Sequence, residues 1–591
     1  MMIHYISINK NQWLSDVLKE IPTNTIFNKT LTGCGATTLE INAARNSIII
    51  EPNVPVIIGK KVQHPQILAV YEGITKDDIK AYLAGEYDGY RKIITTPEGF
   101  AKKVMPAMHE TDTNVYNDYF LLFDECEKTI QDIGYRGDIY LPIEDFFKFK
   151  GKAMVSATPI MPSDPRFREF DMIRLRPTYA YMKKLRVYIT NNTVMVLRRV
   201  IGLCEEHNKK ACIFFNSTDA TLKIIHTLKL EGKSKVFCSE KSMKKLKKEG
   251  YKEVSDKLTD LADVNFFTSR FYSAVDISIN EKPVVIVLTD VYNAPYSTID
   301  PSTEVYQAVG RFRNGVHCIY HITNWDANIT PRSHDAVFHN LNSLELAYRS
   351  VEDVMRTSDP IGKAAIQKSL NEMEYSRFLT TSGSRNYLMW DNAWEDEKIK
   401  GYYKNEASIK NAYKDVPFVT EFNVSTLTIS DEDRLRLSEE RLLSTSSLWR
   451  GAMTLLDNIG KANIDKESAF IIDELGEEFR VMIEAHAILG SECIKRLGYD
   501  RRKIEAALGN IRENRLLTSD EMQKAVYGKY SEGDMVSVTE ITQFMKNLIN
   551  EKGIFYKHRI DRTLIQLYFE ITDKRDRAAR YYVLGKKKFE F

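Results

Sequence analysis

Residues 119–127 read Tyr-Phe-Leu-Leu-Phe-Asp-Glu-Cys-Glu, an apolar run that ends in two adjacent acids. A run this continuously apolar is typical of a strand buried on both faces, as in a parallel sheet covered by helices on each side. Ligands of such sheets bind at the carboxyl ends of the strands. We therefore expect Asp124 and Glu125 at the functional edge of a parallel sheet.

Similar strands recur along the first half of the chain, separated by longer amphipathic segments, and this pattern predicts parallel sheets with crossover helices. The first series comprises Thr25–Lys29, Ser47–Glu51, Lys92–Thr95, Tyr119–Phe123 and Lys152–Ser156. The second series, after Pro177, comprises Arg186–Thr190, Ala211–Phe215, Lys235–Cys238, Asn265–Thr268, Pro283–Thr289 and His317–Ile322. The predicted fold class is α/β, with two tandem parallel-sheet domains.

The α/β pattern stops at the loop-forming stretch Asp326–His334, and the rest of the chain is predicted to be mainly helical. Thr380–Arg385 has the composition of a polar linker, and Asn423–Ser430 is a β-prone stretch before a charged helix. We expect four regions: domains at 1–180 and 181–328, a helical accessory region at 329–535, and a C-terminal module at 536–591.

The C-terminal module is predicted to start with a capped helix and to end with a hairpin. Ser537 and Glu540 have capping-box spacing, and Gly553 is placed to stop the helix. The apolar stripe of that helix is Ile541, Phe544, Met545, Leu548 and Ile549, and the expected hairpin strands are Leu564–Ile571 and Arg580–Leu584. Lys574-Arg575-Asp576-Arg577 between them resembles the wing of a winged helix, and the alternative is a basic, poorly ordered tail.

Composition excludes several classes of protein. The 591 residues include 43% hydrophobic and 28% charged side chains, which excludes a disordered or collagen-like chain. The 83 Lys and Arg nearly balance the 81 Asp and Glu, so any basic surface must be local. Seven cysteines with no C-x-x-C pair disfavour a disulfide framework and a zinc ribbon. With no apolar signal core at the start and no membrane-spanning apolar run, we expect a soluble cytoplasmic protein that does not bind membranes.

A glycine-rich turn, Thr30-Leu-Thr-Gly-Cys-Gly-Ala-Thr-Thr38, follows the first predicted strand. Such turns wrap phosphates with backbone N–H groups, and a Thr hydroxyl there can bind Mg²⁺, the role expected of Thr37. Ala36 stands where the Walker A pattern has its lysine. We hypothesise that Lys29 delivers the missing charge, the alternative being a strand-terminal lysine in solvent.

Three further motifs suit phosphoryl transfer. Asp124 is expected to bind Mg²⁺ and Glu125 to polarise the attacking water, although a lone Asp-Glu can also be an ordinary charged turn. Residues 156–159, Ser-Ala-Thr-Pro, have the spacing of a coupling loop. Residues 307–313, Gln-Ala-Val-Gly-Arg-Phe-Arg, are predicted on a helix whose arginines reach a γ-phosphate, the alternative being an amphipathic helix with surface arginines.

Together these motifs resemble those of superfamily 2 helicases and translocases, which have two RecA-like domains. In order, the matches are motif I (Gly33–Thr38), Ib (Thr95–Gly99), II (Asp124–Glu127), III (Ser156–Thr158), IV (Phe214–Ser217), V (Thr268–Ile277) and VI (Gln307–Arg313). The resemblance covers roughly residues 20–325. Two departures stand out: Ala36 replaces a lysine, and the second arginine of motif VI comes one residue earlier than in the commonest pattern.

The resemblance implies roles for individual residues. ATP with Mg²⁺ would be bound by Gly33, Gly35 and Thr37, with Thr37 and Asp124 on the metal. To this set we add, from the residues themselves, Lys29, Thr32, Cys34, Ala36 and Thr38 of the P-loop and its flank. The catalytic set would be Asp124, Glu125, Gln307, Arg311 and Arg313, with Ser156 and Thr158 coupling the domains. Thr96, Ser217 and Thr268 would contact the nucleic-acid backbone.

The leading hypothesis is a nucleic-acid-dependent ATPase, a helicase or translocase acting on DNA in replication or recombination. DNA, single-stranded or duplex, is preferred over RNA, and a monomer over a ring-forming assembly ATPase because the two α/β halves differ. Local basic runs occur at Lys241–Lys248 and Lys574–Lys588, the first of which is also explained by a solvated helix face. The alternative function is a nucleic-acid-binding or partner-recruiting protein with a degenerate, non-hydrolysing nucleotide site, which Ala36 favours.

Overall fold

The computed structural model describes residues 2–86, 88–111, 113–273, 276–277, 279–459, 477–576 and 579–589. The chain forms two compact units, Met1–Glu432 and Asp433–Phe591. Unit 1 holds two eight-stranded sheets, and unit 2 holds helices and a three-stranded sheet. No helix in the described part of the chain is long and apolar enough to cross a membrane.

The first sheet is parallel throughout, in the order β1-β8-β2-β7-β6-β3-β5-β4. All five strands predicted here are present. The sequence missed β1, which is mostly exposed, the three-residue β4, and β8, where arginines alternate with apolar residues. The strands are β1 (Ile3–Ile8), β2 (Thr25–Asn28), β3 (Asn46–Ile50), β4 (Leu68–Val70), β5 (Lys92–Thr95), β6 (Tyr119–Asp124), β7 (Gly151–Ser156) and β8 (Asp171–Pro177).

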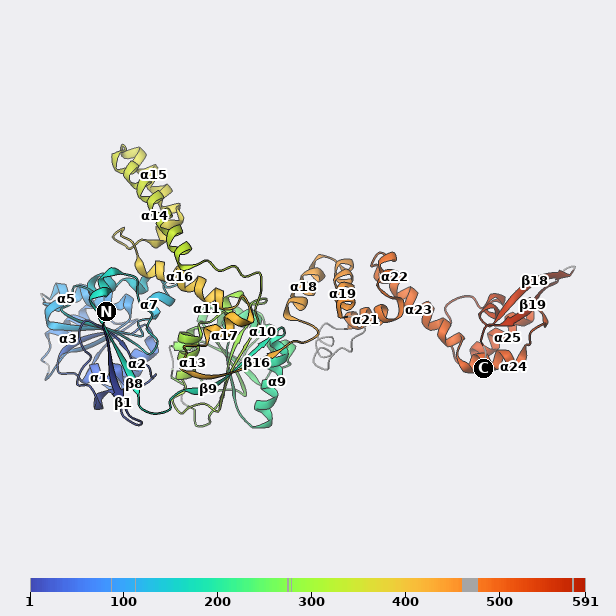
Figure 1. Ribbon diagram of the computed structural model, residues 1–591, viewed down its shortest axis with the longest axis horizontal. Coiled ribbons are helices and arrows are strands. Elements are labelled where there is room, and N and C mark those ends of the chain that lie inside the picture. The colour runs from blue at the N-terminus through green and yellow to red at the C-terminus, as the bar shows by residue number, and fades with distance from the viewer. Residues whose placement is uncertain are drawn as a thin grey trace. The chain divides into compact units, whose positions relative to one another are not determined.

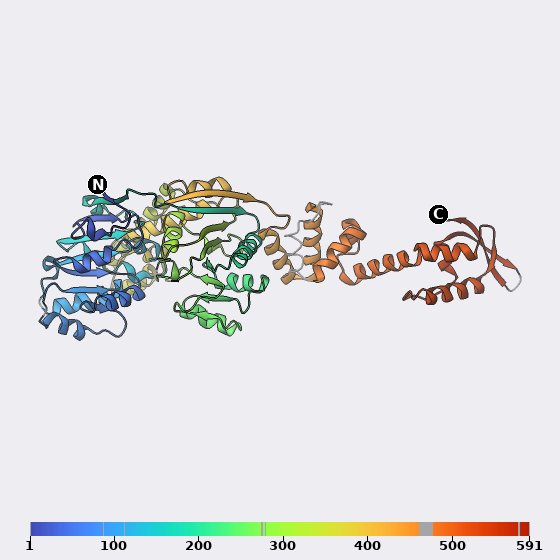
Figure 2. The ribbon, with the colours of Figure 1, turned by 90° about the horizontal axis from the view of Figure 1, so that it is seen from below.

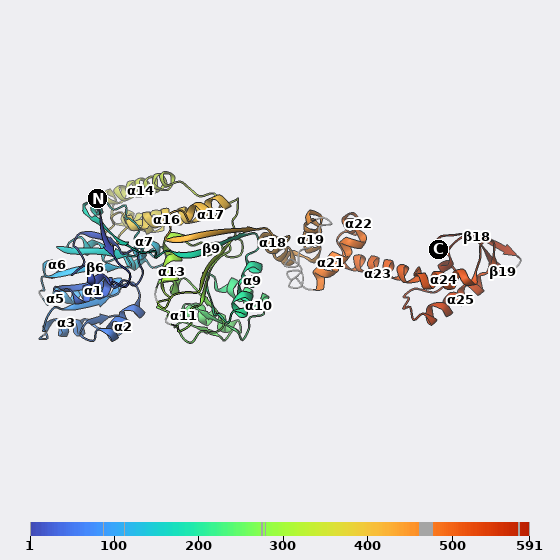
Figure 3. The same cartoon turned by 60° about the horizontal axis from the view of Figure 1, so that its bottom comes forward.

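The second sheet is also parallel, in the order β12-β11-β13-β10-β14-β15-β9-β16. Its strands are β9 (Lys183–Thr190), β10 (Ala211–Phe214), β11 (Ser234–Phe237), β12 (Val254–Ser255), β13 (Val264–Phe267), β14 (Val284–Thr289), β15 (Cys318–Thr323) and β16 (Phe418–Ser425). The six predicted strands are confirmed, and so are two tandem RecA-like parallel-sheet domains. The edge strand β16 lies beside β9 (Figures 2 and 3), so this sheet extends past residue 328, where the sequence placed the end of the second domain.

A helical insertion separates β15 from β16. It begins with α14 (His334–Thr357) and α15 (Pro360–Glu372), which form a hairpin (Figure 1), and continues with α16 (Tyr387–Tyr402) and α17 (Glu406–Ala412). Trp390 of α16 is buried in the core of the insertion. The predicted linker Thr380–Arg385 is a tight loop in which the Arg385 guanidinium lies 4.0 Å from the centroid of a Trp390 ring.

Unit 2 starts with helices and ends with a small antiparallel sheet in the order β17-β19-β18. Its elements include α19 (Thr445–Ile459), α21 (Glu477–Leu489), α22 (Ser491–Arg496), α23 (Arg501–Leu517), α24 (Asp520–Lys529), β17 (Met535–Ser537), α25 (Val538–Glu551), η8 (Arg562–Leu567), β18 (Phe569–Asp576) and β19 (Ala579–Lys587); α18 (Asp431–Leu443) crosses the boundary between the units.

The C-terminal predictions are largely confirmed. The Glu540 N–H donates to Ser537 Oγ at 3.2 Å, which caps α25, and the helix ends before Gly553, whose φ is +62°. The apolar stripe packs into a buried core. The hairpin starts later than predicted, because Leu564–Leu567 belongs to a 3₁₀ helix. Arg577 of the predicted wing lies outside the described residues.

Candidate functional site: a buried charged cluster where the two domains meet

The glycine-rich turn after β2 takes a backbone path that only glycine follows without strain. Gly33 has φ +71° and Gly35 has φ +94°, and α1 (Ala36–Asn42) begins directly afterwards. A Cβ on Gly33 would lie 2.9 Å from Arg313 Cζ of the second domain. One on Gly310 would lie 2.5 Å from Thr32 Cγ2. The turn and the motif VI segment are therefore in direct contact.

Two predicted metal ligands meet at the carboxyl edge of the first sheet. Thr37 Oγ1 donates to Asp124 Oδ2 at 2.6 Å, and Asp124 Oδ1 accepts the Glu125 N–H at 3.0 Å. Glu125 has φ +47°, a left-handed conformation that turns the chain sharply after β6. Hydroxyl and carboxylate oxygens are the ligands that Mg²⁺ prefers, so this pair of side chains fits the metal.

Lys29 lies inside the site and not in solvent. Its Nζ is 3.1 Å from Asp124 Oδ1 and 3.1 Å from Glu125 Oε1, and the residue is 6% exposed. Burial disfavours the cation, but the charges of Asp124 and Glu125 outweigh burial and raise the pKa of Lys29 well above its ordinary value. The alternative of a solvated strand-terminal lysine is therefore wrong. The ammonium lies against the two acids of motif II, beside the turn that lacks its own lysine.

Glu125 and Glu127 are buried close together and differ in ionisation. Burial opposes the charge of Glu125, but Lys29 and Arg311 lower the pKa of its carboxyl to about 2. Burial, with the charge of Glu125, raises the pKa of Glu127 to about 8. The first carboxyl is thus held as an anion and the second is protonated through most of the neutral range.

Gln307 of the second domain bridges these acids. Its Nε2 donates to Glu125 Oε2 at 3.1 Å, to Glu127 Oε1 at 3.0 Å and to Thr158 Oγ1 at 3.2 Å. The buried hydroxyl of Ser156 accepts the Thr158 N–H at 2.9 Å, so both predicted coupling residues join this network.

The motif VI arginines contact the same edge. Arg311 is 3% exposed, donates to Gln307 Oε1 at 2.8 Å and lies 3.9 Å from Glu125 Oε1. Arg313 pairs with Asp276 Oδ1 at 2.7 Å. The alternative of an amphipathic helix with surface arginines is wrong for Arg311. Val275 of motif V lies outside the described residues.

The structure also shows where the remaining predicted P-loop residues lie. Cys34 and Ala36 are buried, and the Cys34 carbonyl accepts the Leu14 N–H at 3.0 Å. Thr38 Oγ1 accepts from the ammonium of Lys60 at 2.9 Å.

Sequence reasoning missed three residues of the site. Trp13 lies beside the P-loop, where a Cβ on Gly35 would be 3.4 Å from its indole, and Lys60 reaches Thr38 from α2 (Val54–Gln63). Glu51 is buried behind β3, where burial and then Asp124 raise the pKa of its carboxyl well above the ordinary value. The strand-end rule could have found Glu51, whereas no motif indicated Trp13 or Lys60.

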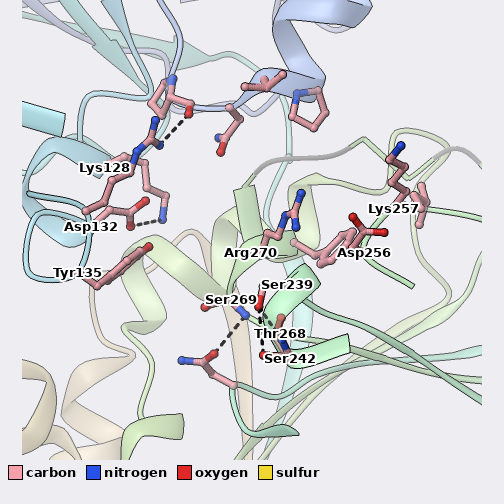
Figure 4. A pocket seen from close by; sticks show the side chains of 18 of the residues that line it. Lys128, Asp132, Tyr135, Ser239, Ser242, Asp256, Lys257, Thr268, Ser269 and Arg270 are labelled. Carbon is pink, nitrogen blue, oxygen red and sulfur yellow. Dashed lines mark hydrogen bonds and ion pairs between the residues drawn. The ribbon is translucent and has the colours of Figure 1, made fainter. Parts of the chain in front are cut away.

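A cavity of about 1470 Å³ lies beside the site and is lined by both domains (Figure 4). The Ser217 hydroxyl accepts the Ala220 N–H at 3.2 Å, and contact of Ser217 or Thr268 with a nucleic-acid backbone stays a prediction. Both residues line the cavity. Thr96 does not: it is buried, and its hydroxyl accepts the Gly99 N–H at 3.0 Å as a helix cap. Four basic side chains line the cavity, namely Lys128, Arg136, Lys257 and Arg270, together with four acidic ones, Glu72, Asp132, Asp256 and Glu304.

No family model and no curated protein matches the sequence. Solved helicase structures resemble the fold. S. cerevisiae Dbp5 bound to RNA and ADP·BeF3 is 14% identical over 65% of this chain and 90% of its own, with a TM-score of 0.32. A DEAD box protein from Methanococcus jannaschii is 15% identical over 51% of this chain and 87% of its own, at 0.28, and the Pyrococcus furiosus Hef helicase domain is 11% identical over 54% and 92%, at 0.29. Similarity this low concerns the fold alone.

Proposed function

We propose that this protein is an ATP-hydrolysing, nucleic-acid-dependent motor of the helicase or translocase type. One observation carries the proposal: the buried acids Glu125 and Glu127 of the first domain, which lie at the Lys29 ammonium, contact Gln307 and Arg311 of the second domain. A nucleotide site completed by two domains can link hydrolysis to relative domain motion.

The residues have the chemistry that the reaction needs. Thr37 and Asp124 would hold Mg²⁺, and Lys29 would face the phosphates in place of a lysine at position 36. Bound ATP with Mg²⁺ would supply the phosphoanhydride bond. Glu125, kept anionic by Lys29 and Arg311, accepts a hydrogen bond from the attacking water and orients it. Arg311 and Arg313 would stabilise negative charge as it develops on the γ-phosphate.

The cavity beside the site is the proposed track for a nucleic acid. Hydroxyls such as Ser217 and Thr268 can hydrogen-bond phosphates, and Lys257 and Arg270 of the second domain can attract the backbone. On the first-domain wall, Lys128 and Arg136 are already paired with Asp132 and Glu98. We propose DNA, single-stranded or duplex, as the substrate and RNA as the competing one. A monomeric motor serving replication or recombination proteins is the context that we propose.

The β18–β19 hairpin of unit 2 is a second proposed contact with phosphates. Arg575 lies directly opposite Arg580 across the strands, and Lys574 precedes it. Like charges in facing positions destabilise a hairpin, and a polyanion would relieve the repulsion. Arg580 is partly compensated by Asp573, whose Oδ2 accepts from Arg580 Nε at 2.8 Å, so Lys574 and Arg575 are the residues that we expect to contact the nucleic acid.

The test is phosphate release from ATP with Mg²⁺, alone and with single-stranded DNA, duplex DNA or RNA. We expect DNA to stimulate turnover and Glu125→Gln to abolish it. Glu110→Gln is the matched control, because Glu110 pairs with Lys80 on the surface, outside the site. Turnover that no polymer stimulates would contradict the motor.

The second candidate is a nucleic-acid-binding or partner-recruiting protein whose nucleotide site does not hydrolyse. Ala36 favours it, because the P-loop lacks its own cation. DNA binding that persists without any ATP turnover, in wild type and Glu125→Gln alike, is the result that would select this function over the motor.

A further inference from the structure

Lys60 is a half-buried cation at the P-loop that contacts only neutral groups. Its Nζ donates to Thr38 Oγ1 at 2.9 Å and to Gln63 Oε1 at 3.4 Å. Within the described ranges of the chain, no carboxylate lies within 4.0 Å of this ammonium. A cation withdrawn from water without an acid beside it is electrostatically unsatisfied.

The other cations of the site differ from Lys60 in this respect. Lys29 contacts both Asp124 and Glu125, and Arg313 is paired with Asp276. An anion that binds to Lys29 or Arg313 must compete with the carboxylate that already pairs with that residue. At Lys60 an anion meets a cation whose charge is still available.

Charged residues of both domains influence the ammonium of Lys60. Burial lowers the pKa of its ammonium, the charges of Asp124 and Asp276 counter this, and Arg313 lowers it further. Glu51 adds a weaker opposing effect. These charges come from both domains, and the hydrogen bond to Thr38 in the first turn of α1 shows that Lys60 faces the P-loop and not the outer surface of α2.

We propose that Lys60 is a second phosphate-binding residue, which contacts the phosphate chain of a nucleoside triphosphate beside Thr38 and, with Lys29, supplies the charge that Ala36 does not. The proposal rests on the nucleotide site proposed above. In a standard P-loop one lysine contacts the β- and γ-phosphates, whereas here a lysine of helix α2 would share that role.

The test is calorimetric titration of the full-length protein with Mg²⁺-ATP, Mg²⁺-ADP and adenosine. A hydrogen bond to a charged group corresponds to roughly tenfold to hundredfold in affinity, so Lys60→Ala should weaken ATP and ADP by about that factor. Adenosine, which has no phosphate, should bind Lys60→Ala as it binds wild type. Lys60→Arg keeps the charge and should retain most of the affinity for ATP.

Lys61→Ala is the matched control, because Lys61 is the next residue of α2 and its Nζ donates to the carbonyls of Pro65 and Ile67. It should bind ATP like wild type. Equal ATP affinity of wild type and Lys60→Ala would overturn the inference, and so would an equal loss for ATP and adenosine, which would make the role of Lys60 structural. Failure of wild type to bind ATP at all would instead overturn the proposed function.

Discussion

Replacing Lys29 by Met should destabilise unit 1 and make its stability depend on pH. The variant removes the ammonium that contacts Asp124 and Glu125 but leaves both acids buried. In wild type the pKa of Glu125 falls from 4.5 to about 2, which corresponds to about 3 kcal/mol of net stabilisation of the anion. Removing one partner of a buried ion pair costs about 3–5 kcal/mol, so we expect a loss in that range at pH 8.

The pH dependence of the stability follows from the sign of the Glu125 pKa shift. A lowered carboxyl pKa stabilises the wild-type fold above pH 4.5, and this stabilisation fades as the pH falls toward 2. Without Lys29 the pKa values of the buried acids rise, and the folded variant takes up protons between pH 8 and pH 5 while the unfolded chain does not. The variant therefore regains stability on acidification, and its deficit relative to wild type shrinks.

Urea unfolding at pH 8 and at pH 5, followed by tryptophan fluorescence, measures this deficit. Four of the five tryptophans lie in unit 1, namely Trp13, Trp325, Trp390 and Trp394, so the signal reports mainly on that unit. The double variant Lys29→Met/Glu125→Gln should recover part of the lost stability, because one uncompensated charge is gone. A deficit that is equal at both pH values, or below about 1 kcal/mol, would refute the reasoning.

Three further predictions concern single side chains. Gly33→Ala forces a Cβ against the Arg313 guanidinium at a left-handed φ, so nucleotide titration should show weakened binding in a folded protein, and unchanged affinity would contradict the contact. Gln307→Glu places a third acid beside Glu127, so its urea midpoint should fall below that of wild type, and further at pH 8 than at pH 5. Burial lowers the pKa of Lys92 to about 8, so wild-type stability should rise from pH 7 to pH 10 through this residue, and Lys92→Met should lack that part of the rise in urea unfolding.

The strands and the acids at their ends could be predicted because one physical constraint fixes both. A strand covered on both faces must be apolar, and its polar successors must lie at the sheet edge, as Asp124 and Glu125 do. The edge strand β16 could not be placed, because the helical insertion separates it from β15 and most of its side chains are exposed or half-buried. A sequence pattern records the burial of a strand but not its neighbour in the sheet.

Contacts between the domains were predictable in type but not in detail. The motif VI residues were expected to reach the nucleotide, yet no spacing rule gives the bridge from Gln307 to Glu127 or the approach of Arg313 to Gly33. For Thr96 the sequence predicted a contact with the nucleic acid, but the structure shows a helix cap. A hydroxyl after a strand can contact a ligand or cap the next helix, and the backbone geometry that decides for a cap is absent from the sequence.

Ala36 alone suggests a site that has lost its activity, but the charges around it argue otherwise. Glu51, Asp124 and Glu127 are each at most 2% exposed, and burying a carboxyl group, ionised or protonated, is unfavourable unless a partner or a function retains it. The Oε1 of Glu51 and the Oε2 of Glu127 have no hydrogen-bond partner among the described residues. Apolar residues at these positions would make a more stable domain. Lys29 compensates part of the negative charge of these acids, and a bound Mg²⁺ would compensate more, so the cluster favours the proposed motor over a degenerate nucleotide site.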